Sequence, residues 1–120
     1  LISRLFISNP ICHSSAMFRK AIYLHSGGYD SHYATSQDLD LWFKLLKYGD
    51  VKFIRSYLVD KYLLSTSVTS KRWIVQVLNS FKIRMAQRER CRYRLCIPLI
   101  CFVTSKHVII SIYNNIIKGK

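Results

Sequence analysis

The sequence predicts an α/β fold followed by a basic, largely helical tail, and three observations support this. Apolar side chains recur at helical spacing over residues 39–46, which predicts a helix with one buried face. Short runs at 51–54, 57–59 and 62–64 are rich in β-branched and aromatic residues and predict strands. Residues 1–60 hold 7 Lys and Arg against 5 Asp, whereas residues 61–120 hold 12 against Glu89 alone. We therefore expect a globular unit over 1–64 and a basic tail over 65–120.

Short elements precede the apolar helix. An extended segment is expected over residues 11–18, and residues 19–26 have room for two helical turns. Gly27 or Gly28 follows with the left-handed backbone that commonly ends a helix. Residues 29–36 are small, polar and without periodicity, so they predict a loop.

The helix that begins near residue 37 is the clearest element. Its apolar residues stand at positions i, i+3, i+4 and i+7, from Leu39 to Leu46. Asp40 and Lys44 form an i, i+4 pair in the favourable order. Gly49 follows as a stop signal.

The tail begins with a Ser/Thr-rich linker over residues 65–70. A helix is expected from residue 71 to about 90, and a further helical stretch, interrupted at Pro98, runs toward 117. The apolar run 95–103 is too short for a membrane span, which needs about 20 residues. The charge of the tail favours an anionic partner, and an apolar run beside arginines favours a membrane surface over nucleic acid.

Four cysteines are present at positions 12, 91, 96 and 101, and none forms a CxxC pair. A zinc site is therefore not expected. Apolar surroundings favour reduced thiols and a cytosolic protein, although an even number of cysteines leaves a disulfide open.

Asp38 is the main candidate for chemistry. A carboxylate in the first turn of a helix is kept ionised by the helix dipole and can act as a general base. The alternative is structural, because residues 35–38 fit a capping box with Asp38 as its acidic member. Both interpretations stay open on the residues alone. Asp38 and Asp40 resemble a metal-binding DxD pair, but residues two apart on a helix do not face each other.

Three other residues are candidates, and for two of them, Gly28 and His13, a functional and a structural interpretation are both open. Gly28 either brings backbone close to a ligand or simply turns the chain. Asp30 can bond its own backbone and orient the loop that follows. His13 either touches a substrate or satisfies a local hydrogen bond.

Three motifs in order resemble the acceptor-side half of bacterial family 2 glycosyltransferases. They are a His-Ser-Ser segment within residues 9–20, a Gly-Gly-Tyr-Asp turn at 27–30, and a Gln-Asp pair that opens the helix at 37–42. The likeness covers about residues 9–70. That family commonly has Glu-Asp or Gln-Asp at the position of Gln37 and Asp38.

The resemblance implies the C-terminal part of a GT-A fold (a Rossmann-like α/β domain) and an inverting transfer from a nucleotide-diphosphate sugar to a hydroxyl acceptor. It implies Asp38 as the base and a substrate-binding role for His13, Ser14, Gly28, Asp30 and Gln37.

The resemblance also implies a divalent cation, Mg²⁺ or Mn²⁺, whose DxD ligands are absent from this sequence, and a half that precedes it. We expect a cytoplasmic enzyme of surface polysaccharide or lipopolysaccharide assembly, peripheral at the inner face of the membrane. The fragment alone is expected to be inactive. The alternative is a non-catalytic basic module that binds a membrane surface or nucleic acid.

Overall fold

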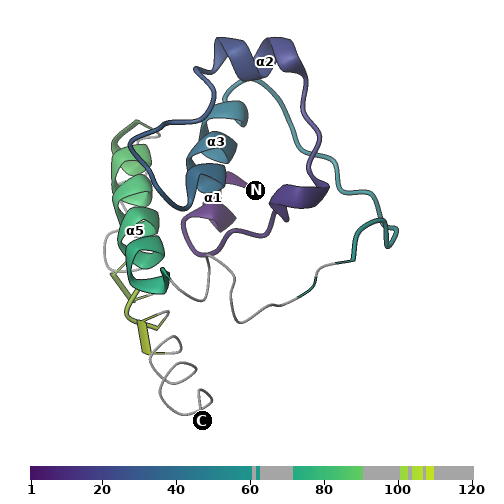
Figure 1. Ribbon diagram of the computed structural model, residues 1–120. Helices are drawn as coiled ribbons and strands as arrows, with labels where there is room; N and C mark the ends of the chain where they lie inside the picture. The colour runs from purple at the N-terminus through teal and green to yellow at the C-terminus, as the bar shows by residue number, and fades with distance from the viewer. Residues whose placement is uncertain (61, 63–71, 91–100, 103, 107, 110–120) are drawn as a thin grey trace. The chain divides into compact units, whose positions relative to one another are not determined.

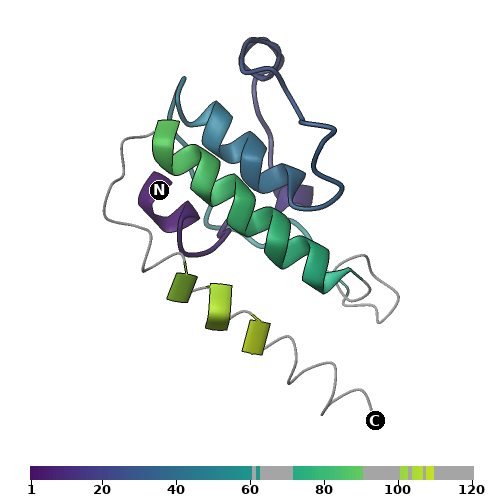
Figure 2. The same cartoon turned by 90° about the vertical axis from the view of Figure 1, so that its left-hand side faces the viewer.

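A computed structural model describes residues 1–60, 62, 72–90, 101, 102, 104–106, 108 and 109 (Figure 1). The chain divides into two compact units, Leu1–Leu64 and Ser65–Lys120. The first unit contains α1 (Ile2–Leu5), the 3-10 helix η1 (His13–Ser15), α2 (Lys20–His25) and α3 (Gln37–Leu45). The second contains α5 (Trp73–Arg90). Figure 2 looks along α2 and shows the loop that leads from it to the start of α3.

The predicted α/β fold is wrong, and so is the GT-A fold that the resemblance implies. The described residues form helices, turns and loops, and none of them lies in a strand. Residues 51–54 and 57–59 are irregular and exposed, although their composition predicts strands. A strand needs a neighbour to complete its hydrogen bonds, and no described segment pairs with them. Of the third predicted strand, residues 63 and 64 lie outside the described residues.

The core of the first unit is formed by α1 and α3, which contact each other. Leu5 and Phe6 at the end of α1 are fully buried, and so are Leu39, Leu41 and Phe43 of α3. The rings of Phe6 and Phe43 lie 4.9 Å apart between centroids and are tilted by 58°. This is a favourable geometry for an aromatic pair. Three residues of the predicted stripe, Leu39, Trp42 and Phe43, are therefore buried, whereas Leu46 is half-buried and the buried face also includes Leu41.

The turn after α2 is held against α3. Gly27 and Gly28 both have left-handed backbone, with φ of 84° and 61°. The carbonyl oxygen of Gly28 accepts a hydrogen bond from Nζ of Lys44 at 3.1 Å. The same Nζ lies 2.7 Å from Oδ2 of Asp40, in the expected i, i+4 ion pair. Lys44 thus joins the helix and the turn through one side chain.

Replacing Gly28 with Ala is expected to destabilise the first unit. A Cβ at Gly28 would lie 2.8 Å from Cζ of Tyr23, in a backbone conformation with φ of +61°. Together the strain and the overlap should cost about 1–3 kcal/mol of unfolding free energy. Gly27→Ala is the matched control, because Gly27 has φ of +84° but no atom within 4 Å of its Cβ position. Urea denaturation measures the unfolding free energy of both variants. An equal decrease in the two would contradict the close approach of Tyr23 to Gly28.

The second unit is described mainly by α5, which extends over most of the helix predicted at 71–90. Ile83, Arg84 and Gln87 are buried, and burial lowers the pKa of the Arg84 guanidinium. Residues 101, 102, 104–106, 108 and 109 are also helical. The predicted linker at 65–70, the interruption at Pro98 and the end of the tail lie outside the described residues. No helix in the described ranges is long and apolar enough to cross a membrane.

Candidate functional site

The carboxylate of Asp38 is held by a distant part of the chain. α3 begins at Gln37, and its N-cap Ser36 is left-handed and makes no side-chain cap hydrogen bond. Oδ2 of Asp38 accepts a hydrogen bond from Nδ2 of Asn9 at 2.8 Å. Oδ1 of Asn9 accepts one from the backbone N–H of Ile11 at 3.3 Å, which fixes the amide with its NH₂ toward Asp38. Because Ser36 and not Thr35 is the N-cap, Asp38 does not occupy the third helical position that a capping box over residues 35–38 requires.

One oxygen of Asp38 remains available. The side chain is partly buried, and within the described part of the chain its Oδ1 accepts no hydrogen bond. A carboxylate fixed through one oxygen, with the other open, has the arrangement that a base or a hydrogen-bond acceptor for a ligand needs.

A histidine–tyrosine pair lies beside this carboxylate. Nε2 of His13, in η1, lies 2.6 Å from Oη of Tyr29. The imidazole also packs against the indole of Trp42, with ring centroids 6.0 Å apart. Burial, followed by the nearby Tyr23 and the charge of Asp38, raises the pKa of the Tyr29 phenol. We call Asn9, His13, Tyr29 and Asp38 the polar cluster.

The phenol of Tyr29 is expected to keep its proton to higher pH than a free tyrosine. Because its pKa is raised above 10.0 in the folded protein, the folded state holds a proton that the unfolded chain releases. The stability that this proton contributes is complete below the ordinary pKa and is lost as pH rises through the raised value. The ¹³Cζ shift of Tyr29, compared with N-acetyltyrosinamide, measures the pKa. Asp38→Asn should lower it, since a negative charge is removed. If Tyr29 has the same pKa as the reference compound, the proposed position of its phenol near Asp38 is contradicted.

The other predicted site residues make local contacts. Oγ of Ser14 lies 3.3 Å from Sγ of Cys12, and the hydrogen bond from Ser14 lowers the pKa of that exposed thiol. Oδ1 of Asp30 accepts hydrogen bonds from the backbone N–H and Nδ1 of His32, which lower the pKa of the carboxyl. Nε2 of Gln37 donates to the carbonyl oxygen of Tyr33 at 2.7 Å. Gly28 has left-handed backbone, and its carbonyl oxygen accepts the hydrogen bond from Lys44. Among the described residues, the structure therefore links His13 to Asp38 only through Tyr29, which bonds to His13 and feels the charge of Asp38. The functional roles of all six residues stay predictions.

The DxD-like pair does not offer two carboxylates to a metal. Asp40 is buried and its Oδ2 is in the ion pair with Lys44, while Asp38 is bonded to Asn9. The described residues also contain no group of three or more His, Cys, Asp or Glu side chains close enough to hold a metal ion. The Mg²⁺ or Mn²⁺ that the resemblance implies does not fit these residues.

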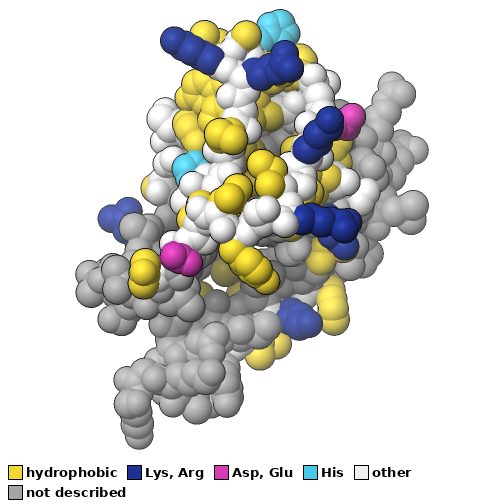
Figure 3. Space-filling view, turned by 90° about the vertical axis from the view of Figure 1, so that its right-hand side faces the viewer, with side chains coloured by type: hydrophobic (Ala, Val, Ile, Leu, Met, Phe, Trp, Pro, Cys, Tyr) yellow, Lys and Arg dark blue, Asp and Glu magenta, His cyan; other side chains and the backbone are white. Residues whose placement is uncertain are grey.

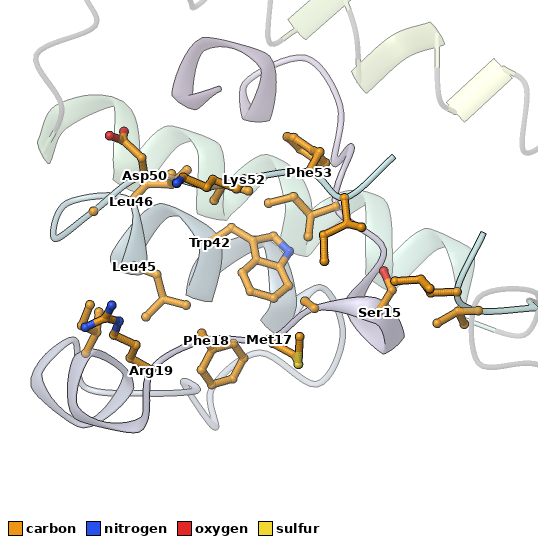
Figure 4. Close-up of a pocket in the computed structure, with 18 of the residues that line it drawn as sticks. Ser15, Met17, Phe18, Arg19, Trp42, Leu45, Leu46, Asp50, Lys52 and Phe53 are labelled. Atoms are coloured by element: carbon orange, nitrogen blue, oxygen red, sulfur yellow. The ribbon is translucent and has the colours of Figure 1, made fainter. Parts of the chain in front are cut away.

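A cavity of about 520 Å³ lies next to the polar cluster in the first unit. Its walls come from residues 11–22, from the C-terminal half of α3 and from residues 49–59. Trp42 lies among the side chains that line it, with Met17 and Phe18 on one side and Phe53 on the other (Figure 4). Trp42 also contacts His13, so one side chain borders both the cavity and the polar cluster.

Asn9, Tyr29 and Trp42 were not predicted as site residues. Trp42 appears in the sequence as part of an apolar stripe, and its second contact with His13 has no sequence signal. Tyr29 is part of the Gly-Gly-Tyr-Asp turn, which singled out its neighbours. Asn9 is 29 positions from Asp38, and only the fold joins them.

Comparisons of the chain with protein-family models, with curated proteins and with solved structures found no match.

Proposed function

We propose that the chain supplies the acceptor side of an inverting glycosyltransferase. The enzyme would move a sugar from a nucleotide-diphosphate donor to a hydroxyl acceptor in surface polysaccharide or lipopolysaccharide assembly. The proposal rests on the carboxylate of Asp38, which is fixed by Asn9 through one oxygen and open at the other. It also rests on the resemblance of the three motifs described above, and it requires no sheet in this chain.

The proposed reaction uses Asp38 as a general base. The acceptor oxygen attacks the anomeric carbon of the donor, the bond from that carbon to the nucleotide diphosphate breaks, and Oδ1 of Asp38 takes the proton of the acceptor hydroxyl. The bond from Asn9 keeps the carboxylate in one orientation during this transfer.

His13 and Tyr29 are the proposed acceptor-binding pair. The phenol of Tyr29, whose pKa is raised above the ordinary value of 10.0, is protonated at neutral pH and can donate a hydrogen bond. Its closeness to Nε2 of His13 fixes its position beside Asp38. A hydroxyl-rich acceptor needs such paired donors and acceptors.

The donor side of the reaction requires another polypeptide segment. Residues of that segment would bind the nucleotide diphosphate and any divalent cation that neutralises its charge. Because the carboxylate of Asp40 forms an ion pair with Lys44, we propose that the metal ligands belong to the other segment. In the same proposal the enzyme works in the cytoplasm at the inner face of the membrane, where the basic residues after position 60 meet anionic lipid.

The test uses membrane-containing extracts of cells that produce the protein and of cells that lack it. Each extract is incubated with Mg²⁺ or Mn²⁺ and with radiolabelled UDP-, GDP- or dTDP-sugars. Label from one donor should enter polysaccharide or glycolipid only when the protein is present. Equal incorporation in both extracts for every donor would contradict the proposal. Salt-sensitive binding of the chain to vesicles or RNA would then favour the non-catalytic alternative.

A further inference from the structure

We propose that the cavity lined by Trp42 binds a hydrocarbon chain of an anionic membrane lipid. The inference concerns a surface other than the polar cluster and does not depend on sugar transfer. Its volume of about 520 Å³ is within the range of small-molecule sites, roughly 300–1,000 Å³. All of its walls belong to the first unit.

The rim of the cavity exposes large apolar side chains. Met17 is 89% exposed, Phe53 61%, Tyr57 109% and Leu58 69%. Single exposed apolar residues are ordinary on protein surfaces, but these four line the same cavity. A concentration of exposed apolar side chains around a hollow marks an interaction site.

The charges at the rim favour an anionic headgroup. Arg19 and Lys52 line the cavity, with Asp50 as its one acidic lining residue among those described. Lys20 and Arg55, the neighbours of lining residues in the sequence, are also exposed. On the face shown in Figure 3, Lys and Arg side chains surround gathered hydrophobic side chains, with few acidic ones between them. Aliphatic and aromatic groups beside cations are typical of surfaces that enter the headgroup region of a bilayer.

The inner wall favours an alkyl chain over a protein partner. It is formed by Ile22, Leu45 and Leu46 together with Trp42, which is only 4% exposed. A flexible hydrocarbon chain can reach such a wall through an opening without presenting polar backbone to it. A second copy of the chain would bring the same cations together across a symmetric interface, in a protein of net charge +13. We therefore commit to lipid.

Trp42 makes the proposal directly measurable. The chain has two tryptophans, so Trp73→Phe leaves Trp42 as the only indole fluorophore. This protein is titrated with phosphatidylglycerol vesicles whose acyl chains carry bromine, a contact quencher. We expect quenching of Trp42 by these vesicles, little by brominated phosphatidylcholine, and a loss of quenching as salt is raised. Vesicle cosedimentation measures total binding in the same samples.

Two exposed rim residues provide the variant. The double variant Phe53→Ser, Tyr57→Ser should bind vesicles more weakly. The vesicle concentration needed for half-maximal quenching should rise by about tenfold or more. Leu24→Ser is the matched control, because Leu24 is 64% exposed on α2 and does not line the cavity. It should leave the quenching unchanged. Since all three side chains are exposed, folding should be retained, as circular dichroism would show.

Three results would overturn the proposal. The first is cosedimentation with anionic vesicles without quenching of Trp42, which would assign binding to basic residues elsewhere. The second is equal quenching in the rim variant and the wild type. The third is concentration-dependent dimerisation in sedimentation equilibrium with no quenching by vesicles, which would assign this face to a second copy.

Discussion

Replacing Asp38 by Asn should lower the rate of sugar transfer in the membrane-containing extracts by about 10²–10⁴-fold, the usual contribution of a general base. The amide has nearly the shape of the carboxylate but cannot take the proton of an acceptor hydroxyl at neutral pH. Because the substitution changes no buried apolar contact, the protein should remain folded. The loss should appear in kcat, with KM for the donor little changed, since the donor is bound elsewhere in our proposal.

The control for this experiment is a carboxylate outside the cluster. Asp60 is exposed, and Asp60→Asn should transfer sugar at the wild-type rate. Asn9→Leu removes the hydrogen bond that orients Asp38 and should reduce kcat by a smaller factor, about tenfold. A near-normal rate in Asp38→Asn, with unchanged circular dichroism, would remove Asp38 as the base.

Replacing Phe43 by Ala should destabilise the first unit by about 3–5 kcal/mol, the range for truncating a buried aromatic side chain. Phe43 is 1% exposed and packs on Phe6, so the substitution leaves a cavity between α1 and α3 and removes an aromatic pair. Domains are stable by only about 5–15 kcal/mol, so this loss should bring the unit close to unfolding.

Urea denaturation followed by circular dichroism measures this loss. Phe53→Ala is the matched control, because Phe53 is 61% exposed and its truncation should change the unfolding free energy by no more than about 0.5 kcal/mol. If the Phe43 variant is too unstable for a full unfolding curve, Phe43→Leu provides a smaller step in the same direction. Equal losses at positions 43 and 53 would contradict the packing of α1 on α3.

The helices of the first unit were predictable where the pattern was long enough. The stripe from Leu39 to Leu46 repeats over two turns, and α3 buries Leu39, Trp42 and Phe43 of it, with Leu46 half-buried. α1 has four residues, too few to show a helical period. The predicted strands failed for a different reason. Val51 and Phe53 have side chains suited to a sheet, but β-propensity describes how a residue fits beside a neighbouring strand. The described residues provide no such neighbour.

The candidate site was predictable only in part. Asp38 was a candidate because a carboxylate in the first turn of an apolar helix suggests either a general base or a helix cap. Its partner Asn9 and the contact between His13 and Tyr29 depend on how loops close over α3, at separations of 29 and 16 residues. No periodicity connects such positions. The spacing that suggested a capping box was misleading because α3 begins one residue later than that box requires, with Ser36 as its N-cap.

Chemical rescue tests the role of Asp38 most directly. Replacing Asp38 by Gly removes the base and leaves space beside Asn9 that a small carboxylate can enter. Transfer from the labelled donor is measured over a range of formate concentrations in membrane-containing extracts of cells that produce the Asp38→Gly protein. Our account predicts very low transfer without formate and a saturable increase with it, while wild-type transfer does not respond. Wild-type activity in Asp38→Gly without formate would contradict it.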